Sequence, residues 1–464
     1  MRKNHSPWLH QLDNTREAER LSRDTAVDVA IIGAGIAGTA TAYFTLKYTD
    51  KSVALVERHR LAHGATGHNA GQVVSYFERG FASMVEEFGA ELAAAGQKAI
   101  DDAWELLDEM YSDAGLDIPF SRFIGHGGLT SLEQVIWHLK NNHAKREAGV
   151  RFAVVHISDH ANISSDIPAE YAGLYDVIPH SDVLSMLETH VTDYIAVVSS
   201  QKGCVNSALF CQEVVTFLQE KYQNRFALYE HTPVHKIVLK SDHALVDADT
   251  HVVTAGRIVL CTNGFESIHI LNDTGLDIDA KYHHLLSGKI GYMSGYLERM
   301  NKLPIAISYY ADPSAGADNS YFYLTRRPYE YEKGAEHNLI SIGGPDIDIE
   351  ETAPYSFESD YPDEMADKID SFVHHVYDAE PNRKIDYVFT WHGLMGYTKN
   401  GMRLIGSEPQ NPVLLYNLGC NGVGILPSVY GGRKISRHLA GEDVPHSIFD
   451  VPMRAESEPQ IDLP

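Results

Sequence analysis

Residues 27–57 constrain the fold more than any other part of the chain. They run VDVAIIGAGIAGTATAYFTLKYTDKSVALVE and contain an apolar strand, a glycine-rich turn, a helix and a second apolar strand. In the first strand Val27, Val29 and Ile31 alternate with smaller or polar residues, as expected of a buried strand. Two strands joined through a helix lie parallel in one sheet, so the segment predicts a βαβ unit of the α/β fold class.

The turn of this unit carries three glycines in the spacing G-x-G-x-x-G. Gly33 allows the tight turn, Gly35 lets the backbone approach a pyrophosphate, and Gly38 lets the helix pack closely on the strand. The free N–H groups at the start of the helix then face the phosphates. Glu57 ends the second strand, where it can accept hydrogen bonds from a ribose diol. The combination indicates a dinucleotide site, and a βαβ unit without a ligand is the alternative.

Composition narrows the partners and the compartment. The chain has 464 residues, with 38 Lys and Arg against 63 Asp and Glu, a formal net charge of −25. Such a surface repels phosphate backbones, so we expect no nucleic-acid partner. The four cysteines form no C-x-x-C pair, which argues against a zinc framework and fits a reducing compartment. Because the N-terminus has no apolar signal region and no window is long enough to span a bilayer, we expect a cytoplasmic protein. The 25 histidines are scattered and form no H-E-x-x-H motif, so we expect no metal site.

Patterns along the rest of the chain suggest two interleaved parts. Residues 58–76 are rich in Gly, His and Asn, which is typical of a functional loop, and residues 89–114 have helical periodicity. We expect short strands through residues 127–198 and tyrosine-rich strands through residues 285–344. Residues 362–378 form an amphipathic helix pattern. The outer thirds are glycine-rich and α/β, and the blocks between them suggest a separate sheet inserted in two pieces.

A second crossing of the dinucleotide favours a flavin over a nicotinamide cofactor. The buried strand of residues 258–261 stops at Thr262, Asn263 and Gly264, and an earlier strand begins at Val234. At the C-terminal end of such a strand the chain crosses the dinucleotide, and Asn-Gly permits close approach. A nicotinamide dehydrogenase does not need this second crossing. An ordinary meander is the alternative.

A third glycine-rich segment precedes the last helix. Gly422, Val423, Gly424 and Ile425 lead to Pro427, which suits a first helical turn because its missing N–H costs nothing there. The N-terminus of this helix can face the flavin N1/C2=O edge, which gains negative charge on reduction. A capped C-terminal helix without that role is the alternative.

Together these blocks resemble the FAD-dependent amine and amino-acid oxidoreductase family, which includes D-amino-acid oxidase, glycine oxidase, sarcosine oxidase, γ-glutamylputrescine oxidase and dimethylglycine dehydrogenase. The resemblance rests on the N-terminal glycine motif, residues 64–72 (GATGHNAGQ), residues 258–264 and residues 391–424. It implies a Rossmann-like FAD-binding domain of discontinuous segments with an inserted substrate domain, an α+β unit with an antiparallel sheet. The expected division is an N-terminal extension at 1–25, the FAD-binding domain at 26–110, 200–282 and 386–446, the substrate domain at 111–199 and 283–385, and a tail at 447–464.

The resemblance, with the motifs above, implies a set of cofactor contacts. They are Gly33, Gly35, Ile36, Ala37, Gly38, Glu57, Arg58, Ala65, Thr66, His68, Asn69, Ala70, Gly71, Gln72, Val234, Thr262, Asn263, Gly264, Gly393, Gly422, Val423, Gly424 and Ile425. In the dimethylglycine dehydrogenase branch a histidine at the position of His68 is bonded to the flavin 8α-methyl group, after a tryptophan. Gly67 stands there instead, so noncovalent FAD is favoured and a covalent link through His68 is the alternative.

Two features of the sarcosine oxidases are missing. Their cysteine tether to FAD lies near Trp391, and no cysteine lies between residues 391 and 406. They also place an oxygen-activating lysine on a late strand, and the matching residues 338–344 contain none. The sequence therefore leaves open whether oxygen or another electron acceptor reoxidises the flavin.

Candidate substrate contacts lie on the strand of residues 321–326. Tyr323 shares a face with Tyr321, and tyrosine faces can hold a cationic amine. Arg326, or its neighbour Arg327, could clamp a carboxylate in a bidentate pair. His392 is a further catalytic candidate beside the flavin edge.

Tyr292 is a weaker candidate for a substrate contact.

The leading hypothesis is oxidation of a primary or secondary amine or amino acid to an imine, by hydride transfer to flavin N5 and then hydrolysis. The alternatives are a flavin dehydrogenase of a hydroxy acid and a flavin-binding subunit without its own substrate chemistry.

Overall fold

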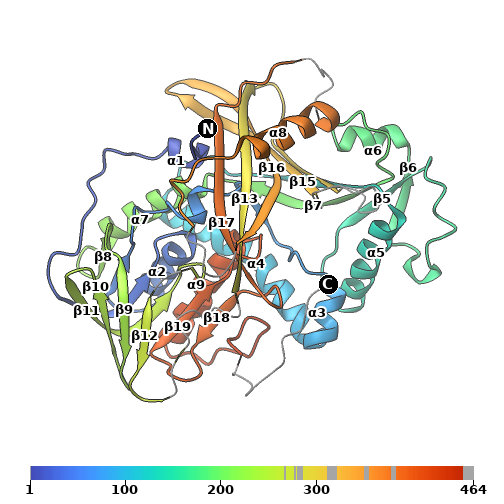
Figure 1. Ribbon diagram of the computed structural model, residues 1–464. Helices are drawn as coiled ribbons and strands as arrows, with labels where there is room; N and C mark the ends of the chain where they lie inside the picture. Colours follow the sequence, from blue (N-terminus) through green and yellow to red (C-terminus); the bar gives the residue numbers. More distant parts are fainter. Residues whose placement is uncertain are drawn as a thin grey trace.

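Two large sheets organise the protein, and helices pack between and around them (Figure 1). The computed structural model describes residues 2–265, 268–275, 278, 286–310, 321–349, 355–377 and 383–452. In Figure 1 the first sheet lies at the lower left, and the second extends from β17 near the centre to β6 at the right. The expected α/β fold with an inserted, largely antiparallel sheet is confirmed.

The first sheet is built around the predicted βαβ unit. Its strand order is β12-β9-β10-β11-β1-β2-β8, and β19 pairs with β11 and β18. The central strand β1 pairs parallel with both β2 and β11. Val29 and Ile31 face the helices, whereas Ala30 and Ile32 pack on the other side of the sheet. The strands are β1 Thr25–Ile32, β2 Val53–Val56, β8 Phe226–Tyr229, β9 Val234–Leu239, β10 Ala244–Ala248, β11 His251–Leu260, β12 His269–Asn272, β18 Leu404–Ser407 and β19 Leu414–Leu418.

The second sheet has the order β17-β13-β16-β15-β14-β4-β7-β5-β6, with β3 paired to β7. Most neighbours are antiparallel, and β14–β4 and β5–β6 are parallel. The strands are β3 Gln72–Val74, β4 Ser121–Leu129, β5 Val154–Ser158, β6 Tyr175–Ile178, β7 Ala196–Cys204, β13 Leu286–Arg299, β14 Ile305–Tyr310, β15 Tyr321–Glu332, β16 Ala335–Ile349 and β17 Phe389–Thr398.

The helices fill the space beside both sheets. The 13-residue α2, which follows the glycine turn, packs along α9 and α7. The helices are α1 Pro7–His10, α2 Ile36–Tyr48, α3 Phe81–Phe88, α4 Ala90–Ala114, α5 Leu132–Glu147, α6 His180–Met186, α7 Ser207–Lys221, α8 Asp363–Phe372 and α9 Ile425–Leu439, with short 3-10 turns at Ala65–Gly67 and Ala169–Tyr171 and a π turn at Val373–Tyr377.

The helix α5 was not expected, because residues 127–198 were predicted to hold short strands. It has 16 residues and begins with a capping box, in which Ser131 and Gln134 satisfy each other's backbone N–H groups. Val135 and Leu139 of α5 pack on Val155 and Ile157 of β5, so the helix covers one face of the second sheet. The Ser-x-x-Gln spacing was the available sequence signal.

The second sheet includes strands that the expected domain division assigned to the FAD-binding domain. The strands β3 and β17 lie within the ranges expected for the FAD-binding domain, yet they pair with β7 and β13. The strand β7 crosses the expected boundary at residue 200. The boundary expected at residues 282 and 283, and residues 453–464 of the expected tail, lie outside the described residues.

The N-terminal segment packs into the molecule instead of extending from it. Trp8 is fully buried and meets Trp391 of β17 edge to face, with ring centroids 6.3 Å apart. His5 bridges to Thr390, since its backbone N–H donates to the carbonyl oxygen at 2.6 Å. This segment therefore joins the start of the chain to the edge of the second sheet.

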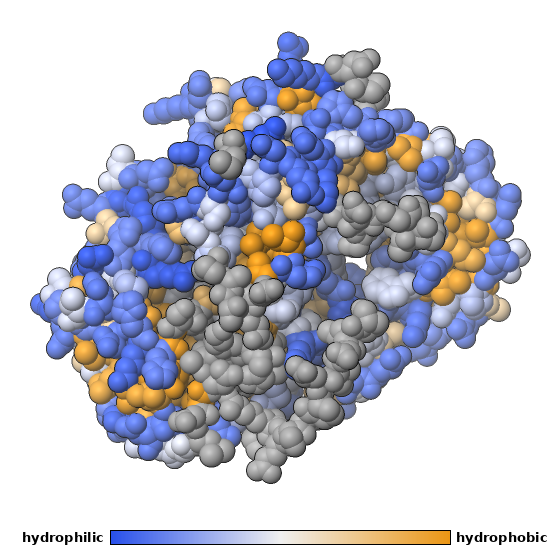
Figure 2. Space-filling model, viewed as in Figure 1, coloured by the Kyte–Doolittle hydropathy of each residue, from blue (hydrophilic) through white to orange (hydrophobic). Residues whose placement is uncertain are grey.

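Figure 2 shows a mostly hydrophilic face, with hydrophobic side chains gathered at the right edge, where Figure 1 places α5, β5 and β6. The strands β5 and β6 carry the exposed Val154 and Val177. Within the described residues, no helix combines the length and apolar character that crossing a bilayer requires.

The close approach of α2 to β1 can be tested at Gly38. A Cβ atom there would lie 1.9 Å from the carbonyl oxygen of Gly33, and backbone cannot move aside without opening the turn. We expect Gly38→Ala to cost about 3 kcal/mol of stability, with loss of bound flavin, measured by thermal unfolding and visible absorbance. Gly64→Ala is the matched control for stability, because a Cβ at Gly64 meets no protein atom within 4 Å. Equal stability of the two variants would contradict this packing.

Candidate active site

A cavity of about 490 Å³ lies between the two sheets. It is lined by the C-terminal ends of β1, β2 and β11, by the loop of residues 64–72, and by β13, β15 and β17. All of the predicted cofactor contacts line it except Gly38 and Gly264. Segments from distant parts of the sequence therefore meet around one elongated space.

The first-sheet end of the cavity has the geometry of a dinucleotide cradle. The Glu57 carboxylate accepts hydrogen bonds from the backbone N–H of Ala34 and of His59, both at 2.9 Å. These bonds fix its orientation, although burial raises its pKa. Gly33 has a φ of +102°, a left-handed conformation that suits glycine. At the start of α2, the Ile36 N–H donates to Thr66 Oγ1 at 2.9 Å.

The loop of residues 64–72 is held by its own polar groups and by two indoles. The carbonyl oxygen of Asn69 accepts from Trp8 Nε1 at 2.5 Å and from Trp391 Nε1 at 3.1 Å. The Asn69 side-chain amide donates to the carbonyl oxygen of Thr66 at 2.9 Å and to Ser207 Oγ at 2.8 Å. The loop is therefore fixed against the N-terminal segment, β17 and the start of α7.

His68 is buried and neutral in this loop. Burial lowers its pKa to about 4, and its Nδ1 lies 3.0 Å from the carbonyl oxygen of Gly64. In a neutral imidazole facing a carbonyl, Nδ1 carries the proton and Nε2 keeps its lone pair. The loop backbone packs on Gly393, where a Cβ would lie 2.4 Å from the His68 carbonyl oxygen.

The residues present fit a bound FAD. The buried Nε2 of Gln72, a cavity-lining residue, has no hydrogen-bond partner among the described residues, so a ligand acceptor can satisfy it. Gly35 is also required to be small, because a Cβ there would lie 2.8 Å from Thr66 Oγ1. Gly422 and Asn263 have left-handed φ values of +75° and +61°, which bring backbone to the cavity wall.

Tyrosines and one carboxylate line the second-sheet end. The Tyr321 hydroxyl donates to Glu78 Oε1 at 3.2 Å, and the ring centroids of Tyr321 and Tyr323 lie 5.7 Å apart. Tyr323 lies over Gly343 of the neighbouring strand. A Cβ atom on Gly343 would lie 2.4 Å from the Tyr323 ring. Its surroundings raise the pKa of Glu78 to about 7, chiefly through burial. Of the predicted catalytic residues, the structure brings only Tyr323 into the cavity.

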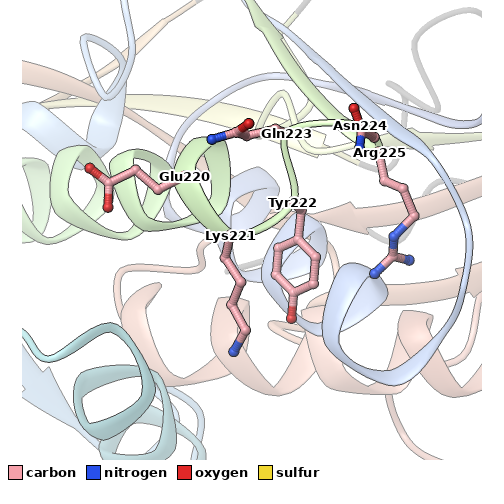
Figure 3. A pocket seen from close by; sticks show the side chains of 6 residues that line it. All are labelled: Glu220, Lys221, Tyr222, Gln223, Asn224 and Arg225. Atoms are coloured by element: carbon pink, nitrogen blue, oxygen red, sulfur yellow. The ribbon is translucent and has the colours of Figure 1, made fainter.

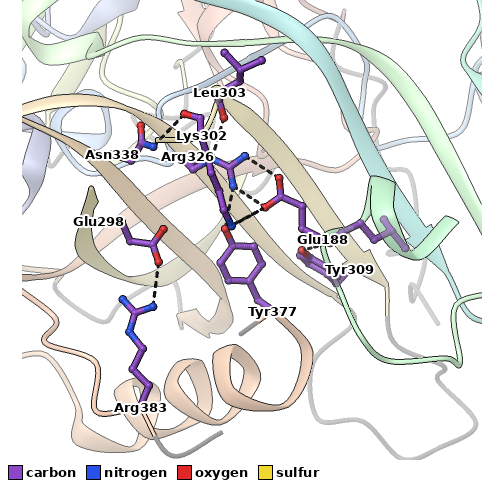
Figure 4. Close-up of polar contacts among 10 residues, drawn as sticks. Glu188, Glu298, Lys302, Leu303, Tyr309, Arg326, Asn338, Tyr377 and Arg383 are labelled. Atoms are coloured by element: carbon purple, nitrogen blue, oxygen red, sulfur yellow. Dashed lines mark hydrogen bonds and ion pairs between the residues drawn. The ribbon is translucent and has the colours of Figure 1, made fainter. Parts of the chain in front are cut away.

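Arg326 lies on the opposite face of β15 and does not line the cavity. Its guanidinium donates to both oxygens of Glu188, at 2.6 and 2.7 Å, and to the Tyr377 hydroxyl at 3.1 Å (Figure 4). Strand alternation requires this, because Arg326 and Tyr323 point to opposite faces. The neighbouring Arg327 is also outside the cavity, with its guanidinium 5.1 Å from the Trp8 ring. This corrects the expectation of an arginine clamp.

His392 is also outside the cavity lining. Its Nδ1 lies 3.0 Å from the Tyr355 hydroxyl and its Nε2 lies 3.0 Å from the carbonyl oxygen of Ser359. Tyr292 lies beside it, with ring centroids 5.8 Å apart, and does not line the cavity either. The neighbouring Gly393 faces the cavity instead, so the alternation of β17 turns His392 away.

The cavity residues that the sequence analysis did not assign include Tyr76 and Glu78, each for a different reason. Tyr76 is the last residue of the functional loop predicted at residues 58–76, so the sequence placed it in that loop without assigning it a role. Glu78 has no local signal, because one acid in a loop is usually a solvated surface residue. Only the fold brings Glu78 against Gly422, which lies 344 residues later in the chain. A Cβ atom on Gly422 would lie 2.5 Å from the Glu78 carboxyl carbon. Within the described residues no cluster of His, Cys, Asp or Glu is arranged to hold a metal ion.

A surface hollow at the end of α7 has a structural explanation (Figure 3). It is lined by consecutive residues 220–225. Arg225 donates to the carbonyl oxygens of Leu46 at 3.1 Å and Thr49 at 2.8 Å. These carbonyls end α2, and a cation is favourable at a helix C-terminus. The hollow therefore lies where Arg225, which follows α7, caps the C-terminal end of α2.

One family model matches most of the chain, and several known proteins resemble it in sequence or in fold. A family model described as FAD dependent oxidoreductase matches residues 28–437. The probable oxidoreductase OrdL of Haemophilus influenzae is 20% identical over 427 residues, which cover 91% of this chain and 85% of that protein. The glycine oxidase of Geobacillus kaustophilus has a similar structure, with a TM-score of 0.66, 16% identity, and coverage of 93% of this chain and 100% of that one. For the L-proline dehydrogenase of P. horikoshii the TM-score is 0.64, with 13% identity and 91% and 95% coverage.

The assignment of Arg326 to structure instead of substrate binding is testable. Arg326→Leu removes the two short hydrogen bonds to Glu188 and leaves this carboxylate only the Tyr377 hydroxyl at 3.4 Å and Lys302 Nζ at 3.8 Å. We therefore expect a loss of about 1–3 kcal/mol of stability, seen as a lower melting temperature, with bound flavin retained. The control is Arg383→Leu, which breaks a more exposed pair with Glu298 (Figure 4) and should cost less than about 1 kcal/mol. An Arg326→Leu protein of unchanged stability but weakened substrate binding would contradict the assignment.

The state of His68 can be tested by colour. We expect acid precipitation to release all of the flavin into the supernatant, because the tryptophan that precedes a flavin-linked histidine is replaced by Gly67. Absorbance of the supernatant and the pellet measures the outcome. Yellow colour that stays in the pellet, and is lost in His68→Ala, would establish the covalent link instead.

Proposed function

The chain belongs to the FAD-dependent oxidoreductase family, and from this membership we propose that it oxidises a primary or secondary amine or amino acid at the C–H bond next to nitrogen. The product is an imine, which water hydrolyses. FAD, when bound, supplies the oxidation by accepting the hydride from that carbon. Oxygen, or a protein or quinone acceptor, then takes the electrons.

The residues of the first-sheet end would hold the cofactor. The glycine turn and the start of α2 suit the pyrophosphate, and the oriented Glu57 carboxylate suits a ribose diol. The unpartnered Gln72 amide would donate to an acceptor of the ring system. The loops at Gly393 and Gly422 let backbone approach the same space.

The observation that carries the amine assignment is the position of Glu78 and Tyr323 in the same cavity as those contacts. An ammonium group is favoured near tyrosine faces and a carboxylate. The amine must then lose a proton, because its nitrogen lone pair drives the hydride loss. Glu78, with a pKa of about 7, is placed to accept that proton near neutral pH.

Anaerobic mixing with a panel of substrates tests the proposal. We expect one or more amines to remove the visible flavin absorbance, and the matching alcohols and hydroxy acids to leave it unchanged. Glu78→Gln should lower the rate of bleaching at least about tenfold, because it loses the proton acceptor. Bleaching by a hydroxy acid and by no amine would overturn the proposed reaction class.

A further inference from the structure

The buried lysine Lys202 of β7 lies on the cavity face of the second sheet. In the sheet register Gly127 of β4 pairs with Ser308 of β14, and Ser308 pairs with Tyr323 of β15. Paired residues share a face of the sheet, and Gly125, two residues before Gly127, shares it too. The Lys202 side chain crosses β4 at Gly125, because a Cβ atom there would lie 2.5 Å from Lys202 Cδ. Lys202 therefore occupies the face that carries Tyr323 toward the cavity.

The ammonium group of Lys202 has no acidic partner. The residue is 4% exposed, and its Nζ lies 3.5 Å from Ser308 Oγ and 5.9 Å from the centre of the Tyr76 ring. Both Ser308 and Tyr76 line the cavity. Lys202 forms no ion pair within the part of the chain that the structure describes. Burial lowers its pKa to about 8, and no neighbouring carboxylate raises it again.

A second lysine at this end is already paired. Lys289 lies 3.5 Å from Asp346 and 3.1 Å from Asp348, and its charge also acts on Glu78. Lys202 and Glu78 lie apart, since neither contributes to the pKa of the other. A buried charge is normally paired, because its removal from water is costly. A negative group of a ligand is the partner that Lys202 lacks.

Ser308 connects this lysine with the cavity. Its hydroxyl oxygen can accept from the Lys202 ammonium and still donate its own proton to a ligand. A carboxylate is the acceptor that gains most from such a pair, because its hydrogen bonds are strengthened by charge.

We infer that Ser308 and Lys202 hold a carboxylate of the substrate, with the Ser308 hydroxyl as the direct donor and Lys202 as the compensating charge. The inference rests on the proposed function and narrows its substrate to an amine that also carries an acid group. Glu78 and Tyr323 receive the amine end, so the substrate is held at two separate points, which orients the C–H bond that reacts.

The test separates binding from oxidation by using two ligands that have no amine to oxidise. Propionate carries the carboxylate, and propionamide is a neutral molecule of nearly the same shape. Each is titrated into the FAD-loaded protein, and binding is followed by calorimetry and by the shift of the flavin spectrum. We expect propionate to bind at least about tenfold more tightly than propionamide, because hydrogen bonds to a charged group are the stronger ones.

Two variants and one control assign the selectivity. Lys202→Met should weaken propionate binding about tenfold and leave propionamide binding unchanged, and Ser308→Ala should weaken propionate binding about fivefold. The melting temperature of Lys202→Met should not fall, because the variant removes a buried charge without a partner. Lys98→Met removes the same charge from a side chain that is 69% exposed and should leave both affinities unchanged. If Lys202→Met does not fold, Ser308→Ala and the ligand pair still decide the result.

The outcomes distinguish this inference from the proposed function. Propionate that binds no better than propionamide, or a Lys202→Met protein that loses affinity for both ligands equally, would overturn the inference. Selective propionate binding in a protein that no amine bleaches would support the carboxylate site and overturn the amine reaction. Bleaching by amines without an acid group, and by no amino acid, would support the reaction and overturn the narrower substrate class.

Discussion

The carbonyl oxygen of Asn69 joins the parts of the protein that form the cavity. It accepts hydrogen bonds from two fully buried indoles, Trp8 of the N-terminal segment and Trp391 of β17. A buried carbonyl needs a partner, and an indole supplies both a donor and a large apolar surface. Once this loop is fixed, Thr66 holds the start of α2 and Gln72 begins the strand that pairs with β7. The two sheets therefore share one loop, and the cavity lies beside it.

The two carboxylates of the cavity differ because their surroundings differ. Glu57 is held by two backbone N–H groups, which suits a residue that orients a ligand. Glu78 has a tyrosine hydroxyl as its partner and lies among aromatic rings, and burial raises its pKa to about 7. One cavity thus has an end lined by oriented backbone N–H groups and glycine turns and an end lined by tyrosines and Glu78.

Sequence reasoning succeeded where function needs a local backbone shape. The glycine turn and the segment before α9 were identified from spacing, the loop of residues 64–72 was identified from composition and family resemblance, and the structure brings all three to one cavity. It also grouped Tyr323 with Tyr321 on one face of a strand and Arg326 on the other. It could not decide which of the two strand faces lines the cavity. Side-chain alternation defines two faces but does not show which one the rest of the fold will cover.

The sequence by itself determined the βαβ unit and the nature of its turns, because glycine spacing and strand periodicity act within a few residues. Only the tertiary structure decided the substrate end of the site. There Glu78 meets Gly422 and Tyr321, and His392 and Arg326 are turned toward partners of their own. Most of those contacts join segments more than 100 residues apart, and they depend on how two sheets pack, which no short stretch of sequence contains.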